Sequence, residues 1–290
     1  MAHSRNPTLP NLLIIGARKG GTTSLHKYLA LHPQIFMSKQ KELSFFDERI
    51  RWRLGLEWYK SNFDASYLIN GEASPQYARY PRTSGVPEKI KDILGSPKLI
   101  YAIRDPVDRI LSDYTQMVEW RPDKPSWEEL LPSIANDQEQ YVECSSYFFQ
   151  VSQYLKFFPR ENIHFVILER LNADPRTTLE QVFRFLGVDE KYWSKEYGRR
   201  FNAGQHKRFH SSWFDRWAPT ALKQQLRRPS WIPMKAVNIV DRAARLGGVP
   251  IVKPKISPEE DLSLQKMLSR DVAALRELLN DPLPEWRPYA

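Results

Sequence analysis

Residues 12–24 read Leu-Leu-Ile-Ile-Gly-Ala-Arg-Lys-Gly-Gly-Thr-Thr-Ser, an apolar run that enters a turn containing glycine. The apolar run predicts a buried strand at 12–15, and the residues from 22 to 31 predict a helix. A glycine loop between a strand and a helix directs backbone N–H groups and the helix N-terminus toward one point, which suits a phosphate or sulfate group. The sequence therefore predicts an anion site at Lys19, Gly20, Gly21, Thr22, Thr23 and Ser24.

The position of Lys19 distinguishes this loop from an ordinary ATP-binding loop. In the Walker A pattern G-x-x-x-x-G-K-[ST], the lysine follows the last glycine. Gly16 and Gly21 have that spacing, but Thr22 occupies the lysine position and Lys19 precedes the glycine pair. A P-loop kinase or NTPase is therefore an alternative hypothesis, and it predicts ATP binding that depends on Mg²⁺.

Apolar runs alternate with stretches that have helical periodicity along much of the chain. Strands are expected at 12–15, 68–71, 98–103 and 163–168, and helices at 22–31, 57–63, 87–94, from 106 onward, 127–135, 146–158, 178–186 and 258–279. Such alternation favours an α/β fold, with a mostly parallel central sheet flanked by helices, that is P-loop-like. We expect a single domain over residues 1–290, with a basic, aromatic-rich helical or loop elaboration at about 198–254.

A second cationic position follows the strand expected at 98–103. Arg104 is the first residue after that run, where a P-loop NTPase is expected to carry an aspartate for Mg²⁺. An arginine there can bind an anion directly through its guanidinium fork, and a salt bridge to Asp105 or Asp108 is the alternative explanation. Ser112 lies on the following helix, which Asp105 is expected to cap, and its hydroxyl can share the same phosphate. The sequence thus predicts two anion sites at one sheet edge, with no metal ligand between them.

Composition narrows the class of protein. The single cysteine, Cys144, excludes an internal disulfide. No apolar stretch approaches the ~20 residues that a membrane span needs, and residues 1–10 carry no apolar signal core. Hydrophobic residues make up 41% of the chain, which is enough for a real core. We therefore expect a protein of a reducing compartment, most simply the cytoplasm.

The net charge of +9 is concentrated between residues 199 and 255, where Asp215 and Asp241 are the only acidic residues. A local basic field favours anionic ligands, nucleic acid or an anionic membrane surface. A non-catalytic binder of anions or nucleic acid is therefore a further hypothesis, and it predicts binding that weakens steeply with salt. The ordered motifs at 16–24 and 104–112 are hard to explain in that case. We expect no nucleic-acid partner, and we leave peripheral membrane contact open.

Several short motifs occur in one order between about residues 12 and 187. They are Ile15-Gly16-Ala17-Arg18-Lys19-Gly20-Gly21-Thr22, Leu31-His32-Pro33, Lys41-Glu42-Leu43-Ser44-Phe45-Phe46-Asp47, Arg104-Asp105-Pro106, Arg109-Ile110-Leu111-Ser112-Asp113-Tyr114, Phe157-Phe158-Pro159, Glu169-Arg170-Leu171 and Asp174-Pro175. Each motif alone is weak, and their order makes the set specific. The set resembles the sulfotransferases that use 3′-phosphoadenosine 5′-phosphosulfate (PAPS), above all the heparan sulfate branch and its bacterial relatives.

The resemblance implies the sulfotransferase fold and an activity. Such an enzyme moves a sulfuryl group from PAPS to a hydroxyl or amine without a metal and releases adenosine 3′,5′-bisphosphate (PAP). By position, Lys19 and the amides from Gly20 to Ser24 would hold the 5′-phosphosulfate, with Lys19 stabilising the leaving phosphate. Arg104 and Ser112 would hold the 3′-phosphate.

Glu42 matches the glutamate that is proposed in the heparan branch as the general base for the acceptor's proton. Glu72, also at a strand end, and the histidines stay open as rival bases. The heparan branch typically has Glu-Lys-Thr-Pro after its second strand, whereas this sequence has Glu72-Ala73-Ser74-Pro75. The missing lysine argues against a heparan-like polysaccharide acceptor, and a glycan, a lipid head group, a natural product and a tethered acyl chain are all candidates.

Overall fold

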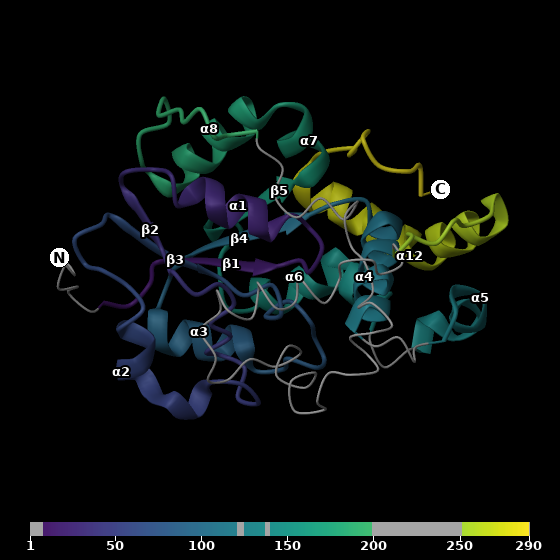
Figure 1. Ribbon diagram of the computed structural model, residues 1–290, viewed down its shortest axis with the longest axis horizontal. Helices are drawn as coiled ribbons and strands as arrows, with labels where there is room; N and C mark the ends of the chain where they lie inside the picture. Colours follow the sequence, from purple (N-terminus) through teal and green to yellow (C-terminus); the bar gives the residue numbers. More distant parts are fainter. Residues whose placement is uncertain (1–7, 121–124, 137–139, 199–250, 290) are drawn as a thin grey trace, which may run out of the picture. The chain divides into compact units, whose positions relative to one another are not determined.

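The computed structural model describes residues 8–120, 125–136, 140–198 and 251–289. Five strands form one sheet in the order β2-β3-β1-β4-β5, and every neighbouring pair is parallel (Figure 1). Their bounds are β1 Leu12–Gly16, β2 Ile35–Met37, β3 Ile69–Ala73, β4 Lys98–Ile103 and β5 Ile163–Ile167. The expected α/β class with a parallel central sheet is therefore confirmed.

Helices connect the strands, and most lie where the periodicity predicts them. They are α1 Thr22–Leu29, α2 Gly55–Lys60, α3 Val86–Leu94, α4 Pro106–Trp120, α5 Trp127–Leu130, α6 Tyr147–Leu155, α7 Leu168–Ala173, α8 Pro175–Leu186 and α12 Pro258–Leu279. The short strand β2 and the short helix α7 are absent from the sequence-based expectation. The helix expected at 127–135 is a short α-helix, α5, that continues as a 3-10 helix over Leu131–Asn136.

The two faces of the sheet are covered by different helices (Figure 1). On one face, α1, α7 and α8 pack apolar side chains such as Leu25 and Phe183 against Ile14 and Ile100. On the opposite face lie α3 and α6. The Tyr101 ring of β4 contacts Tyr147 of α6 edge to face there, with the ring centroids 5.8 Å apart. Burial on both faces explains why β1 and β4 are almost continuously apolar.

The strand order places a topological switch between β1 and β4. From β1 the chain passes to β2 and β3 on one side, and from β4 it passes to β5 on the other side. In open α/β sheets, ligands bind outside the carboxyl ends of the strands at such a point. The fold therefore places the loop after β1 and Arg104 after β4 at the position where a ligand crevice is expected.

The chain divides into two compact units. One contains residues 1–110, 132–202 and 256–290, and therefore the whole sheet, and the other contains residues 111–131 and 203–255. The single domain that we predicted over 1–290 stays a prediction, and most of the expected elaboration at about 198–254 lies outside the described residues. Within the described part of the chain, no helix combines the length and the apolar character of a membrane span.

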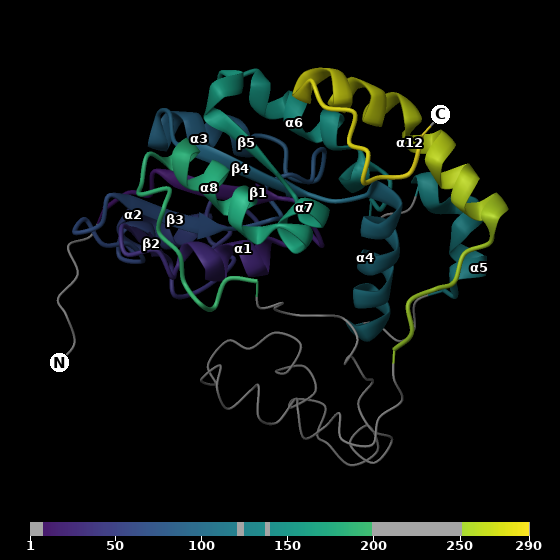
Figure 2. The same ribbon diagram turned by 90° about the horizontal axis from the view of Figure 1, so that it is seen from above.

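The last long helix, α12, contacts α6 in the unit that contains the sheet (Figure 2). Ser257 and Glu260 form a capping box at its start, and Asn280 ends it in the left-handed conformation. Within the helix, the Asp271 carboxylate accepts hydrogen bonds from the backbone N–H groups of Phe148 (3.0 Å) and Phe149 (2.8 Å) in the first turn of α6. These two bonds satisfy N–H groups that have no partner within α6.

His26 on α1 and His164 on β5 predict how stability depends on pH. Burial lowers the pKa of each imidazole to about 4, and the charges of Lys41 and Arg160 lower the pKa of His26 and His164 respectively. Between about pH 4 and 6.5 both imidazoles are protonated in the unfolded chain and neutral in the folded one. These residues should therefore raise the free energy of unfolding by about 2.7 kcal/mol per pH unit in that range.

Urea unfolding of the parent protein and the His164→Gln variant at pH 4.5, 5.5 and 6.5 isolates the histidine contribution, because the raised pKa of Asp271 acts in the opposite direction equally in both proteins. The His164→Gln variant should show about half of the histidine contribution. A slope that is the same in the variant and the parent protein would contradict this assignment.

Candidate functional site

The loop after β1 lies directly on the end of β4. The Ala17 N–H donates a hydrogen bond to the Ala102 carbonyl oxygen at 2.6 Å, and the Gly20 N–H donates to the Ala17 carbonyl oxygen at 2.9 Å. A Cβ atom at Gly20 would lie 2.2 Å from the Ala102 oxygen, so only glycine fits at this position. The loop is therefore fixed to Ala102, which precedes Arg104 by two residues in the sequence.

The backbone of this loop has the form of an anion-binding turn. Lys19 and Gly21 both have positive φ angles, 69° and 92°, and α1 begins directly afterwards at Thr22. Left-handed residues within a turn direct successive N–H groups to one side, and the helix N-terminus adds a partial positive charge there. The predicted residues Lys19 to Ser24 therefore form one continuous turn and first helical turn. The left-handed conformation of Lys19 was not foreseen from the sequence.

Arg104 follows β4, and its guanidinium group can still donate hydrogen bonds to a ligand. Its Nη2 donates to Asp108 Oδ2 at 3.1 Å, so the salt bridge considered from the sequence is present, with Asp108 as the partner. Its Nε is buried and has no hydrogen-bond partner among the described residues. Because a buried polar atom without a partner is costly, this side chain is suited to accept an anion.

Ser112 lies on α4, as predicted, and its side chain is partly buried. It belongs to the second compact unit, whereas Arg104 belongs to the first. Its proposed share in the 3′-phosphate site therefore stays a prediction.

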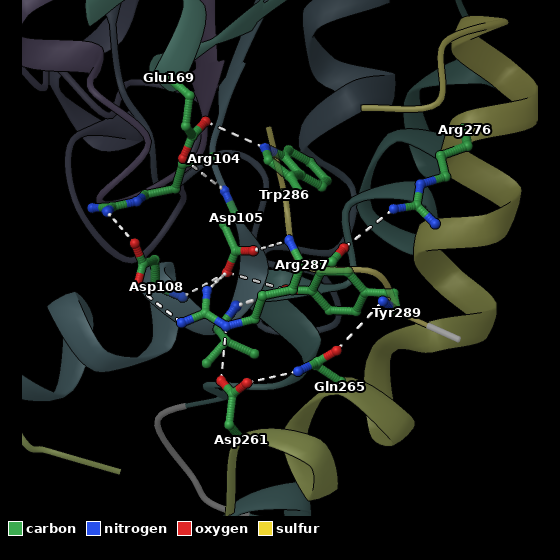
Figure 3. A network of polar contacts seen from close by, with 11 residues as sticks. Arg104, Asp105, Asp108, Glu169, Asp261, Gln265, Arg276, Trp286, Arg287 and Tyr289 are labelled. Atoms are coloured by element: carbon green, nitrogen blue, oxygen red, sulfur yellow. Dashed lines mark hydrogen bonds and ion pairs between the residues drawn. The ribbon is translucent and has the colours of Figure 1, made fainter. Parts of the chain in front are cut away.

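Asp105 is occupied by its own network (Figure 3). One carboxylate oxygen accepts from the Asp108 N–H at 3.0 Å, which confirms that Asp105 caps α4. The same oxygen accepts from the Tyr289 hydroxyl at 3.1 Å and from Arg287 Nη1, and the other accepts from the Arg287 N–H at 3.0 Å. The sequence-based analysis missed Arg287 and Tyr289, because nothing in the local pattern connects them to position 105.

Glu42 lies at the carboxyl edge of the sheet, beside β3. Its N–H donates to the Ala73 carbonyl oxygen at 3.0 Å, and Ala73 is paired with Ile14 of β1. Its φ is 62°, and Arg51 Nη1 donates to its carbonyl oxygen at 2.6 Å. The side chain is 44% exposed and forms an ion pair with Lys41 at 2.7 Å. The carboxylate is therefore held at this edge and remains accessible.

Glu72 has a different environment. Its side chain is completely buried, and it accepts hydrogen bonds from the hydroxyls of Tyr59 (2.8 Å), Tyr77 (2.8 Å) and Ser74 (2.6 Å). Burial raises the pKa of Glu72, while the three hydroxyl donors act in the opposite direction. The carboxylate therefore links α2 to the turn that follows β3 and is closed to solvent.

His26 on α1 and His32, which lies between α1 and β2, both have structural partners. His26 Nε2 lies 3.1 Å from the Ser38 carbonyl oxygen, and His32 Nε2 lies 3.0 Å from the Asp189 carbonyl oxygen. His206 and His210 lie outside the described residues. Within the described ranges, no group of three or more His, Cys, Asp or Glu side chains is placed to hold a metal ion.

Known proteins resemble this chain in sequence. Heparan sulfate glucosamine 3-O-sulfotransferase 5 of Mus musculus is 35% identical over 211 residues, which are 69% of this chain and 59% of that protein. Heparan sulfate glucosamine 3-O-sulfotransferase 3B1 of Homo sapiens is 33% identical over 192 residues, 64% of this chain and 48% of that protein. The chain thus spans only about half to three fifths of the length of these relatives.

Solved structures resemble the fold. A sulfotransferase from Alicyclobacillus acidocaldarius superposes with a TM-score of 0.67 at 24% identity, over 96% of this chain and 98% of that one. Mouse sulfotransferase SULT7A1, solved in complex with PAP, superposes with a TM-score of 0.53 at 15% identity, over 95% of this chain and 89% of that one. In addition, the sequence model of the family described as "Sulfotransferase domain" matches residues 9–217, well over half of the sequence. The chain therefore belongs to the sulfotransferase domain family.

Proposed function

We propose that this protein transfers a sulfuryl group from PAPS to a hydroxyl or amine of an acceptor. The observation that carries the proposal is the arrangement of two anion-binding elements at the switch point of the sheet. Gly20 lies against Ala102, and Arg104 follows two residues later. Two such elements side by side suit a nucleotide that carries phosphate groups at both its 5′ and 3′ positions.

The residues present fit that nucleotide. The turn formed by Lys19, Gly20 and Gly21 offers backbone N–H groups to one anion, beside the start of α1. Arg104 offers a buried Nε that has no partner among the described residues, and its Nη2 bond to Asp108 can be exchanged for a bond to phosphate. When bound, PAPS supplies an activated sulfuryl group whose departure leaves negative charge on a phosphate oxygen.

Each residue then has a distinct task. The Lys19 ammonium stabilises the negative charge that develops on the leaving phosphate. The Arg104 guanidinium and the Ser112 hydroxyl hold the 3′-phosphate and so orient the nucleotide. The Glu42 carboxylate removes the proton from the acceptor hydroxyl or amine as that group attacks sulfur.

Accessibility favours Glu42 over Glu72 as the base. A general base must come within hydrogen-bond distance of the acceptor, either directly or through one water molecule. The Glu42 side chain is 44% exposed, whereas that of Glu72 is completely buried and already accepts hydrogen bonds from three hydroxyl groups. We therefore assign the proton transfer to Glu42 and a structural task to Glu72.

We infer a polar acceptor from a polar cavity whose lining begins at Phe46, four residues after Glu42 in the sequence. A cavity of about 150 Å³ lies between residues 46–49, which continue from Glu42, and residues 82–89. Its lining includes Arg49, Arg82 and Lys89 together with two carboxylates. A glycan, a lipid headgroup or a natural product with several polar groups is compatible with this lining.

The two proposed phosphate contacts predict the effect of charge removal on PAP binding. Lys19→Ala and Arg104→Ala should each raise the Kd of PAP by about tenfold to a hundredfold, because a hydrogen bond to a charged group contributes about 1.5–3 kcal/mol. Isothermal titration calorimetry measures the Kd, and a thermal-shift comparison with Mg-ATP tests the kinase alternative. Lys27→Ala, an exposed lysine on the same helix, is the matched control. Unchanged PAP affinity in both site variants would refute the assignment.

The assignment of the base predicts a separation of binding from turnover. Glu42→Gln should bind PAP within twofold of the parent protein, while sulfuryl transfer should fall by about 10²–10⁴-fold. Transfer is followed with sulfur-labelled PAPS and host extract as the source of acceptor. Glu57→Gln, an exposed carboxylate on α2, should retain full activity. Normal turnover in the Glu42 variant would mean that another group is the base.

The contrast between the two glutamates also predicts a difference in stability. Glu72→Leu leaves three buried hydroxyls without their acceptor and should lower the free energy of unfolding by about 3 kcal/mol or more. The same change at Glu42 should alter it by about 0.5 kcal/mol or less, as is usual for surface positions. Urea denaturation of the two variants compares them directly. Equal losses would argue against the structural task assigned to Glu72.

A further inference from the structure

Residues 281–289, which follow α12, lie along the start of α4 and are held there by polar contacts (Figure 3). Arg170 on α7 forms ion pairs with Asp281 and with Glu285 at 2.6 Å. Trp286 Nε1 donates to Glu169 Oε2 at 3.2 Å, and Glu169 Oε1 accepts the Asp105 N–H at 3.1 Å. The segment is therefore coupled to the residue that directly follows Arg104.

Arg287 is the centre of these contacts, and it faces three carboxylates. Its Nε donates to Asp261 Oδ1 at 2.7 Å, and its backbone N–H donates to Asp105 Oδ2 at 3.0 Å. Its Nη1 forms an ion pair with Asp105, and its Nη2 lies 3.5 Å from Asp108 Oδ1. The side chain is 27% exposed, so solvent screens these charges only partly.

Asp108 is shared between two arginines. Arg104 Nη2 binds its Oδ2 at 3.1 Å, while Arg287 Nη2 approaches its Oδ1. A phosphate that binds Arg104 must compete with Asp108 for the same guanidinium. A second cation beside Asp108 weakens that competition, because it offers the carboxylate another partner and reduces its repulsion of the phosphate.

We propose that Arg287 is a positioning residue for the 3′-phosphate of the nucleotide, acting through Asp105 and Asp108 on Arg104. The proposal rests on the function proposed above, in which Arg104 holds that phosphate. Arg287 neutralises Asp105 and Asp108 and fixes the turn from which Arg104 projects. Its removal takes one of the cations away from Asp108, which keeps its ion pair with Arg104, and it takes away the guanidinium that is paired with Asp105.

The proposal predicts a defect that is confined to the 3′-phosphate. Arg287→Met keeps an unbranched, flexible side chain and removes the charge and the hydrogen-bond donors. The Kd of PAP should rise by about tenfold, whereas the Kd of adenosine 5′-monophosphate, which lacks the 3′-phosphate, should stay within twofold. Calorimetric titration of both nucleotides into the full chain gives the two values.

Second-site rescue separates a charge effect from a merely structural one. Asp108→Asn in the Arg287→Met background should restore PAP affinity to within about threefold of the parent protein, because the competing carboxylate is gone. Asp108→Asn alone should tighten PAP binding, and it tests the proposal even if Arg287→Met fails to fold. Arg170→Met removes another anchor of residues 281–289 without a direct bond to Asp105 or Asp108, and it should leave both affinities unchanged.

Three results would overturn the proposal. They are an equal loss of affinity for both nucleotides in Arg287→Met, a loss that Asp108→Asn does not restore, and weaker PAP binding in Asp108→Asn alone. A failure of the proposed function has a different signature, because Arg104→Ala would then leave PAP affinity unchanged. If Arg104→Ala weakens binding and Arg287→Met does not, only the role of Arg287 is wrong.

Discussion

The contact between the loop at 17–21 and the end of β4 is the constraint on which the rest of the site depends. The Ala102 carbonyl oxygen accepts the Ala17 N–H, and Gly20 approaches the same oxygen so closely that no side chain fits. This contact joins the ends of β1 and β4 at the switch point of the sheet. It therefore fixes the segments that carry Lys19 and Arg104 relative to each other. A parallel sheet provides this arrangement because all its strands end at the same edge.

The same edge contains backbone conformations that a side chain normally avoids. Lys19, Glu42 and Ser44 all have positive φ angles without being glycine, and each such residue costs roughly 1–2 kcal/mol. Sheet and turn contacts hold Glu42 and Ser44 in place, since the Glu42 N–H binds Ala73 and the Ser44 N–H binds the Ser74 hydroxyl. The backbone conformation of Lys19 and Glu42, two residues proposed to carry the chemistry, thus helps to determine where their side chains point.

Much of the fold could be predicted from the sequence. The strands β1 and β4 are continuous apolar runs, and the helices α8 and α12 combine apolar periodicity with helix start and stop signals. The three-residue strand β2 is too short to show a period, and α7 follows β5 without a break. The loop at 19–24 and Arg104 were proposed as site residues from the local sequence alone. Arg287 and Tyr289 could not be found in this way, because they meet Asp105 across more than 180 residues and no spacing rule connects them.

That long separation has a consequence during synthesis of the chain. Asp105 and Arg287 are 182 residues apart. At about 5–20 residues per second, a ribosome needs roughly 10–40 s to extend the chain from one to the other. All five strands of the sheet can pair in this interval, while Asp105 and Asp108 still lack Arg287. The nascent protein therefore acquires its sheet before the electrostatic setting of the proposed cofactor site is complete.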